Sequence, residues 1–334
     1  LDPASGKWDR TQLGQPPRKC LVCGKEGKGC ASRRLHTVEE LQSATQAILE
    51  DYFAKKDQQT LGALAAKALL YEVCTTPKPG LVDRKNNGSH RDMDVFTFLD
   101  STAALLPYFE EAVRLGIETR NLPPQETFRR LRQAGAAGER AMFRATGGVN
   151  THKGAVFTLG TVCAAAGRLW TAEGFSKDLD AALALCGEMS AQAVQEDFEA
   201  IRREGAHTTG QRIYLEHGLE GIRGELSRGL PAVAQIGLPT LRRCLEAGDS
   251  MEQAGVQVLL ALMAQVVDTN LIARGGLEGQ QWAMEQAKNL TQDRAVSQEE
   301  AEKLDRALIE RNLSPGGCAD LLAITYFLEF LSRM

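Results

Sequence analysis

Apolar residues recur at the spacing of an α-helix along most of this chain. After Gln58 the repeat runs through Leu61, Leu64, Ala65, Ala68, Leu69 and Glu72. A period of 3.6 residues places side chains on one helix face, whereas a half-buried strand alternates every second residue. No convincing alternation follows later in the chain. The pattern therefore predicts an all-α protein built around a single large compact multi-helix domain.

Further helices are predicted from the same spacing together with helix-start signals. A Ser side chain can accept a hydrogen bond from the first free backbone N–H groups of a helix, and Ser250, Ser297 and Ser314 stand where such caps are needed. Residues 205–240 are less regular. The predicted helices cover residues 94–115, 124–145, 152–171, 177–203, 250–272, 298–312 and 315–332.

The first 36 residues depart from this pattern, because they are rich in Gly, Pro, Lys and Arg. They begin with Leu1 rather than Met, which we interpret as the tail of something longer. Thr37 and Glu40 predict a capping box that opens a helix to about Phe53, and a polar linker follows. The predicted organisation is a Cys-containing appendage over residues 1–36, a helix and linker over 37–57, and the main domain over 58–334.

Charge and hydropathy narrow the classes of partner. The chain has 334 residues and a formal net charge of −4, which argues against a nucleic-acid surface that works by counterion release. No apolar run reaches the ~20 residues that cross a bilayer, and the N-terminus lacks the apolar core of a signal peptide. We therefore expect a cytoplasmic protein that binds small molecules, with neither a nucleic-acid nor a membrane partner.

The predicted helices are separated by polar breaks, the first of which holds Lys78 and Asp83. Pro77 and Pro79 stop the preceding helix and stiffen the turn, while Gly80 permits a close backbone approach. A solvated turn is the alternative interpretation. A second break carries His90, Asp92 and Asp94 within five residues. Asp92 and Asp94 could hold Mg²⁺ together with substrate phosphates, or one of them could simply cap the next helix.

The third break, Gly147–Gly154, is the most informative of them. Its glycines let the backbone turn, and Asn150, Thr151, His152, Lys153 and Gly154 offer polar groups to a polyphosphate. The order Gly-x4-Gly-Lys-Ser/Thr is absent from the whole chain, which disfavours a standard P-loop phosphoryl transfer. A polar helix start with a coincidental Lys is the alternative.

Two further groups of polar residues lie later in the chain. Arg223, held between glycines, could clamp phosphate or form only a surface ion pair. Asp268, Asn270 and Arg274 are predicted to end a strongly apolar helix, where a buried Asp needs a metal or a cation as partner. The segment Ser314-Pro315-Gly316-Gly317 is predicted to open the last helix, with Pro315 as its first residue and Asp320 in its first turns.

Taken in this order, these segments resemble the triphosphoribosyl-dephospho-CoA synthase family over residues 58–334. The residues that carry the resemblance are Pro77–Asp83, His90–Asp94, Gly147–Gly154 and Ser314–Gly317. The resemblance implies that ATP reacts with 3′-dephospho-CoA. The ribose 2′-hydroxyl attacks C1 of the ATP ribose, adenine leaves, and the triphosphate stays intact. The product is the precursor of the citrate lyase prosthetic group.

The resemblance also implies inversion at C1 and a single displacement, for which a carboxylate would be the base. Candidates for the base are Asp83, Asp92 and Asp268, and His90 and His152 are candidates for acid work or ligand contact. Mg²⁺ and cations would neutralise the triphosphate. The residues expected to bind the substrates are Lys78, Pro79, Gly80, Asn150, Thr151, Lys153, Gly154, Arg223, Asn270, Arg274, Gly316, Gly317 and Asp320.

The N-terminal segment resembles the end of the citrate lyase holo-acyl-carrier-protein transferase, which attaches the same prosthetic group. The resemblance rests on Trp8–Gly14, on Arg18–Cys23, and on Cys30 and His36. It suggests a fused bifunctional protein whose product passes to the carrier-protein transferase. Cys20, Cys23, Cys30 and His36 could bind Zn²⁺, although the spacing is not that of a standard finger. Reduced cysteines that pack the appendage are the alternative.

Three other functions stay open on the sequence alone. The same reaction could serve malonate decarboxylase, whose maturation uses a related synthase, although the N-terminal segment favours citrate lyase. Water in place of dephospho-CoA would make the protein an adenine-releasing nucleotide hydrolase. A non-catalytic module that docks the carrier protein is the third, and it would bind neither ATP nor dephospho-CoA.

Overall fold

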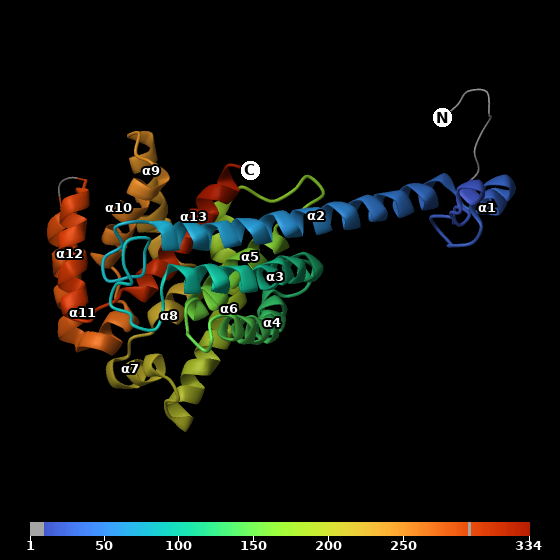
Figure 1. Ribbon diagram of the computed structural model, residues 1–334. Helices are drawn as coiled ribbons and strands as arrows, with labels where there is room; N and C mark the ends of the chain where they lie inside the picture. Colours follow the sequence, from blue (N-terminus) through green and yellow to red (C-terminus); the bar gives the residue numbers. More distant parts are fainter. Residues whose placement is uncertain (1–9, 293–294) are drawn as a thin grey trace. The chain divides into compact units, whose positions relative to one another are not determined.

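The computed structural model describes residues 10–292 and 295–334 of the chain. Helices make up most of these residues, and the described part contains only two isolated β-bridges and no named strand (Figure 1). The all-α prediction is confirmed. The chain folds as two compact units, Leu1–Lys56 and Asp57–Met334.

The first unit contains the 3₁₀-helix η2 (Arg10–Leu13) and the short helix α1 (Gly27–Arg33). Of the segment on which the transferase resemblance rests, Trp8 and Asp9 lie outside the described residues. The predicted capping box is present, because Thr37 N–H donates to Glu40 and Glu40 N–H donates to Thr37 Oγ1.

Helix α2 (Val38–Cys74) corrects the prediction of a polar linker after Phe53. The helix is continuous through residues 55–57. Lys is a good helix former, and Lys55 also pairs with Asp51 one turn earlier at 2.7 Å. Polarity at those positions therefore marked an exposed helix face and not a break.

Helices α5 (Lys153–Arg168) and α13 (Gly316–Ser332) pack against each other inside the second unit. Both are apolar around most of their circumference, and in α13 every residue from 321 to 331 is buried. A helix that is apolar on all sides stabilises a fold only when other elements surround it. Even so, no helix in the described residues is long and apolar enough to cross a membrane.

Helices α3 (Val95–Thr119), α4 (Pro124–Ala145) and α6 (Leu179–Glu204) pack around α5. The packing of α3 on α5 is close because Gly116 lies against the backbone of Ala164. A Cβ at position 116 would lie 2.1 Å from the Ala164 carbonyl oxygen. The short helices α7 (Thr209–His217) and α8 (Gly221–Ser227) occupy part of the region that the sequence left irregular.

The π-helix η3 (Val233–Gly237), α9 (Leu238–Glu246) and α10 (Met251–Met263) contact α13, and α11 (Thr269–Thr291) also contacts it. Helix α12 (Gln298–Glu310) contacts α11. The caps predicted at Ser250 and Ser297 are confirmed, each in a capping box.

Two predictions near the C-terminus were wrong. The helix predicted over 250–272 is two helices, and Asp268 begins the second as its N-cap instead of ending the first. Ser314 does not cap α13, and Pro315 is the N-cap instead of the first helical residue. The Ser314 hydroxyl is 2.9 Å from His90 Nε2, so the side chain that looked like a cap makes a tertiary hydrogen bond.

Candidate active site

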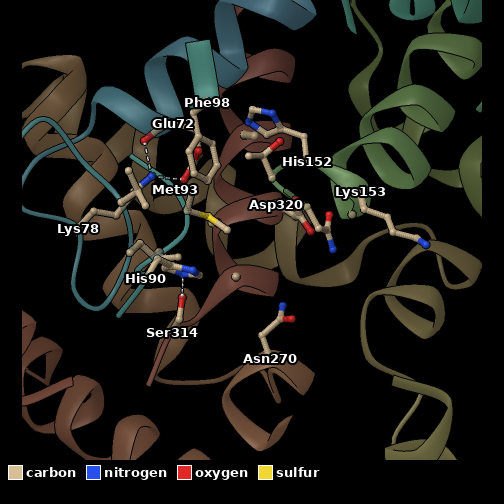
Figure 2. Close-up of a pocket in the computed structure, with 18 of the residues that line it drawn as sticks. Glu72, Lys78, His90, Met93, Phe98, His152, Lys153, Asn270, Ser314 and Asp320 are labelled. Atoms are coloured by element: carbon tan, nitrogen blue, oxygen red, sulfur yellow. Dashed lines mark hydrogen bonds and ion pairs between the residues drawn. The ribbon is translucent and has the colours of Figure 1, made fainter. Parts of the chain in front are cut away.

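A cavity of about 280 Å³ lies in the second unit, where α2 ends and α5, α11 and α13 begin. The loop that connects α2 to α3 also contributes to its wall. Many of the predicted site residues line it together: Lys78, His90, Asp92, Asn150, Thr151, His152, Lys153, Gly154, Asn270, Arg274, Gly316 and Asp320. Segments that lie far apart in the sequence therefore meet at one site (Figure 2).

Three helix N-termini face this cavity. Lys153 and Gly154 begin α5, Gly316 begins α13, and Asn270 lies in the first turn of α11. The N-cap residues of α5 and α13 supply no side-chain cap, but Asp320 accepts from Ala155 N–H in the first turn of α5 and Asp268 accepts from Cys318 N–H in the first turn of α13. The first N–H groups of a helix have no partner within it, and its dipole is positive at that end. The arrangement therefore suits a multiply charged anion such as a polyphosphate.

Lys78 and Glu72 form a buried ion pair in the cavity wall. Lys78 is only 1% exposed, and its Nζ donates to the Glu72 carboxylate and, at 3.1 Å, to the Glu72 carbonyl oxygen. Burial raises the pKa of Glu72, and the nearby Lys78 opposes that rise. As the partner of a buried ammonium, Glu72 is held in its ionised form.

Glu72 was missed as a site residue because it continues the apolar stripe of its helix. It stands in register with Ala65, Ala68 and Leu69 on the buried face of α2. An acid on an apolar face needs a partner, and this was the available signal.

Asp320 lies one turn inside α13, against the start of α5. A Cβ at Gly154 would lie only 1.8 Å from Asp320 Oδ2, so the glycine leaves the room that this carboxyl occupies. None of the ion pairs found among the described residues includes Asp320. Burial, together with the negative charges of Glu72 and Asp268, raises the pKa of Asp320 well above its usual range. Asp320 is therefore a carboxyl that keeps its proton more readily than an ordinary Asp.

Both histidines of the cavity are held neutral. Burial and the nearby Arg274 lower the pKa of His90 to about 4, and burial lowers the pKa of His152 to about 3. His90 Nδ1 accepts from Arg274 at 3.1 Å, so its Nε2 carries the proton and donates to Ser314. At neutral pH neither ring can serve as a charged acid.

His152 offers a single free donor to the cavity. Thr151 Oγ1 donates to Ser101 Oγ at 2.7 Å, and Ser101 Oγ lies 2.7 Å from His152 Nδ1. This chain of hydroxyls makes Nδ1 the acceptor and leaves the proton on Nε2. Nε2 is buried and has no hydrogen-bond partner among the described residues. A ligand atom that accepts a hydrogen bond would satisfy it.

The other charged residues of the cavity wall differ in their exposure and in the partners they have within the protein. Arg274 donates at 2.8 Å to the Ser89 carbonyl oxygen and at 3.0 Å to the Asn312 side chain, which ties the α2–α3 loop to the segment before α13. Lys153 pairs with Glu139 at 3.3 Å and extends away from the other labelled side chains (Figure 2). Asp92 is exposed at the mouth of the cavity.

Asp83 and Asp268, two of the three candidate bases, do not line the cavity. Asp83 accepts from the backbone N–H groups of residues 78, 85 and 86, which closes the loop that holds Lys78. Asp268 accepts from Asn270 N–H and Cys318 N–H, which joins the first turns of α11 and α13. Both carboxylates therefore hold in place the loop and the helix ends that form the cavity, although neither lines it.

Five more predicted residues also lie outside the lining. Gly80 has a φ of +73°, and a Cβ there would lie 2.5 Å from the Leu313 carbonyl oxygen. Pro79 belongs to the same loop, and Gly317 lies against the Asp268 carboxylate. Asp94 caps α3 in a capping box with Thr97. Arg223 pairs with Asp197 at 2.7 Å, away from the cavity wall.

The first unit holds a separate group of potential metal ligands. Cys20, Cys23, Cys30 and His36 each offer one ligand atom, and these atoms lie within 4.8 Å of one another. Among the described residues, no other group of three or more His, Cys, Asp or Glu side chains meets the same criterion. These four residues could hold a metal ion.

Residues 58–334 match the profile of the ATP:dephospho-CoA triphosphoribosyl transferase family. Residues 1–52 match that of the apo-citrate lyase phosphoribosyl-dephospho-CoA transferase family. No solved structure matches the chain.

Several named relatives are similar over most of the chain. A 2-(5''-triphosphoribosyl)-3'-dephosphocoenzyme-A synthase of Pectobacterium atrosepticum is 41% identical over 290 residues, which cover 86% of this chain and 94% of the relative. The synthase of Haemophilus ducreyi is 38% identical over 332 residues, 94% of this chain and 99% of the relative. Protein CitXG of Haemophilus influenzae is 37% identical over 96% of this chain and 70% of its own length. The chain therefore belongs to the ATP:dephospho-CoA triphosphoribosyl transferase family.

Proposed function

We propose that this cavity transfers the 5-triphosphoribosyl group of ATP to the 2′-hydroxyl of 3′-dephospho-CoA and releases adenine. The family supplies the two substrates. The observation that carries the assignment to this cavity is that helix N-termini line it beside Asp320, a half-buried carboxyl with a raised pKa. The product, 2′-(5''-triphosphoribosyl)-3′-dephospho-CoA, would serve citrate lyase. The match of residues 1–52 to a citrate lyase transferase family supports this choice over malonate decarboxylase.

In this reaction the triphosphate binds to the enzyme but does not leave. The bond that breaks joins C1 of the ribose to the adenine ring, and every phosphate bond survives. The N-termini of α5 and α13, together with Arg274, would hold the phosphates, since all three line the cavity. Binding energy from these remote contacts then positions C1 for attack.

We assign the proton donor to Asp320. Adenine leaves readily only when a ring nitrogen gains a proton, so the donor must be protonated before the reaction begins. The raised pKa of the Asp320 carboxyl meets this requirement, whereas His90 and His152, with pKa values of about 4 and 3, are neutral. His152 Nε2 would instead donate a hydrogen bond to a bound substrate.

We assign the base to Glu72. Its ion pair with Lys78 keeps it ionised, while burial raises its pKa above that of an exposed Glu and so makes it more basic. Two carboxyls in one cavity, one ionised and one protonated, suit the base and acid roles of an inverting displacement. The 2′-hydroxyl gives its proton to Glu72 as its oxygen bonds to C1, and adenine takes the bonding electrons and the Asp320 proton.

Mg²⁺ is expected to enter with the triphosphate. Mg²⁺ is commonly held by one or two carboxylates plus substrate phosphates. Asp92 fits this role because it is exposed at the cavity mouth, whereas Asp94 is engaged in capping α3. When bound, the ion would neutralise phosphate charge, and Asp92 would hold it.

We also propose a separate function for each of two parts of the chain. Residues 58–334 would carry the synthase activity, and residues 1–36 would belong to a carrier-protein transferase that receives the product. The fused relative Protein CitXG, which is similar over 333 residues, supports such an arrangement.

Adenine release from ATP by the purified protein tests the proposal. With Mg²⁺ present, we expect release only when dephospho-CoA is added, together with an adduct whose mass retains all three phosphates. Equal release without dephospho-CoA would make the protein a nucleotide hydrolase. No release, with no binding of either substrate, would favour a docking module. The matched control is Glu111→Gln, which removes a carboxylate of a surface ion pair with Arg114 and should leave release unchanged.

A further inference from the structure

We propose that Cys20, Cys23, Cys30 and His36 form a structural zinc site in the first unit. Zinc binds Cys sulfur at about 2.3 Å and His nitrogen at about 2.0 Å with tetrahedral geometry, so its ligand atoms lie roughly 3–4 Å apart. The four candidate ligand atoms lie within 4.8 Å of one another, and the Cys23 and Cys30 sulfurs are 3.4 Å apart. The geometry needs only a small contraction to close around one ion.

The backbone around Cys20 and Cys23 is built as a tight turn. Gly24 N–H donates to the Cys20 carbonyl oxygen at 2.9 Å, and Cys20 N–H donates to the Lys25 carbonyl oxygen at 2.7 Å. Gly24 has a φ of +70°, a conformation that glycine adopts without the penalty of a Cβ. The turn brings the two thiols of the Cys-x2-Cys segment to the same group of ligands.

Helix α1 carries the third thiol, and the turn that follows it brings the fourth ligand close to the thiols. Cys30 lies in the last turn of α1, and Arg34 ends the helix in the left-handed conformation. Leu35 N–H then donates to the Cys30 carbonyl oxygen at 3.2 Å. This reversal carries His36 back beside the thiols, which explains how a spacing unlike that of a standard finger can still converge.

The two ring nitrogens of His36 have different surroundings. Its Nδ1 lies 3.6 Å from Glu40 Oε2, and the same carboxylate oxygen accepts from Thr37 N–H at 2.8 Å. Its Nε2 is buried and has no hydrogen-bond partner among the described residues. A carboxylate on one ring nitrogen commonly fixes a His ligand and leaves the other nitrogen for the metal.

The described part of the first unit offers little buried packing around this arrangement. Among residues 10–56 only Cys20 and Cys30 are buried, so the described part has no apolar core. Very small folded units usually need a metal or disulfides in place of a core. Three thiols and one imidazole form a closed ligand set of the Cys₃His type, which is characteristic of structural zinc and leaves no open position for catalysis.

The first test measures zinc bound to the full chain, purified under reducing conditions, by elemental analysis. We expect about one zinc ion per chain, most of which is lost in Cys23→Ser and in His36→Asn. Cys74→Ser changes a cysteine outside the group and should retain it. Glu40→Gln keeps a side chain that can complete the capping box, and it should weaken zinc binding about 10–100-fold. Equal zinc in all variants would overturn the proposal.

Cobalt substitution of the unmodified chain provides a readout that does not depend on the folding of variants. Co²⁺ should give intense thiolate-to-cobalt absorption and the ligand-field bands of a tetrahedral site. Uptake of neither zinc nor cobalt, or a cobalt spectrum without thiolate bands, would contradict the proposal. So would a mass lower by two hydrogens with a Cys23–Cys30 disulfide, because that would make the cluster a redox pair.

Discussion

The two units of this chain hold their chemically important side chains in opposite ways. In the second unit, Glu72, Lys78 and His152 are each less than 5% exposed, and the walls around them include the buried helices α5 and α13. In the first unit, only Cys20 and Cys30 are buried among residues 10–56, and turns together with the short helix α1 bring the four ligands close to one another. A large core can position polar groups before any ligand arrives, whereas ligands that converge with little buried packing around them gain stability when a metal binds.

The two units also differ in how they can accommodate buried charged groups. Removing charged groups from water destabilises a fold by several kcal/mol per ion unless a partner compensates. The second unit has an apolar core that can offset such a cost and so can keep an ion pair and neutral histidines inside. Changes confined to one unit at a time should separate the two cases.

Asp320→Asn should have the largest effect. The amide fits the space beside Gly154 but cannot give a proton to adenine, and loss of general acid catalysis typically slows a reaction 10²–10⁴-fold. We expect kcat to fall by this factor with little change in KM for ATP, measured as adenine release. In the unmodified enzyme, kcat should also fall as pH rises through the raised pKa of Asp320, because the acid form is then lost. A decrease of less than threefold in kcat would remove Asp320 from this role.

Lys78→Met should destabilise the second unit by about 3–5 kcal/mol, because it leaves the buried Glu72 carboxylate without its cation. The free energy of unfolding in urea measures this effect. Lys55→Met, which breaks an exposed ion pair with Asp51, is the matched control and should change stability by less than about 1 kcal/mol. Equal effects of the two changes would contradict the importance of burial in the cavity wall.

The pH dependence of stability should reveal the buried His152. Its pKa is about 3 in the folded protein and about 6.5 when unfolded, so the unfolded state takes up a proton first as the pH falls. Stability is unaffected above pH 6.5 and then decreases by about 1.4 kcal/mol per pH unit until the folded pKa is reached. Between pH 7.5 and 5.5, wild type should lose about 1.4 kcal/mol more than His152→Gln. Parallel curves would mean that His152 is not buried in its neutral form.

Removal of zinc should have the smallest effect on catalysis. If the cavity is held by its own core, a zinc-selective chelator, with Mg²⁺ kept in excess, should leave adenine release within about twofold of its initial rate, while residues 18–36 lose protection from hydrogen exchange. Amides in α5 and α13 should keep theirs. Loss of both activity and core protection would show that the two units do not behave as differently as their burial indicates.

The sequence predicted the fold class and most helices because helical periodicity and capping residues are local signals. It failed where a polar stretch continues a helix and where tertiary contacts override local signals. Polar Lys55 and Lys56 continue a helix, and the apolar run after Met251 is interrupted between Met263 and Thr269. Ser314 has the local features of a cap, yet its hydroxyl bonds to a His that lies 224 residues earlier.

The segments that form the candidate site could be predicted from the sequence, but the role of each residue in it could not. Polar breaks between helices identified the residues that meet in the cavity. Whether a carboxylate faces a cavity or the backbone depends on packing that no local pattern encodes, so Asp83 and Asp268 could not be told apart from Asp320. Glu72 was missed because it lies in the apolar stripe of its helix. Arg223 was predicted to bind substrate, but it forms an ion pair with Asp197 on a neighbouring helix.

If Asp320 is the proton donor, a substrate whose base leaves without a proton should rescue Asp320→Asn. An ATP analogue methylated at N7 of adenine carries a positive charge on the ring, so its base can leave without an acid. We expect this analogue, with dephospho-CoA, to react with the variant at a rate within about tenfold of the wild-type rate, although ATP itself reacts roughly 10²–10⁴-fold more slowly. If the variant is impaired equally with both nucleotides, Asp320 is not the proton donor.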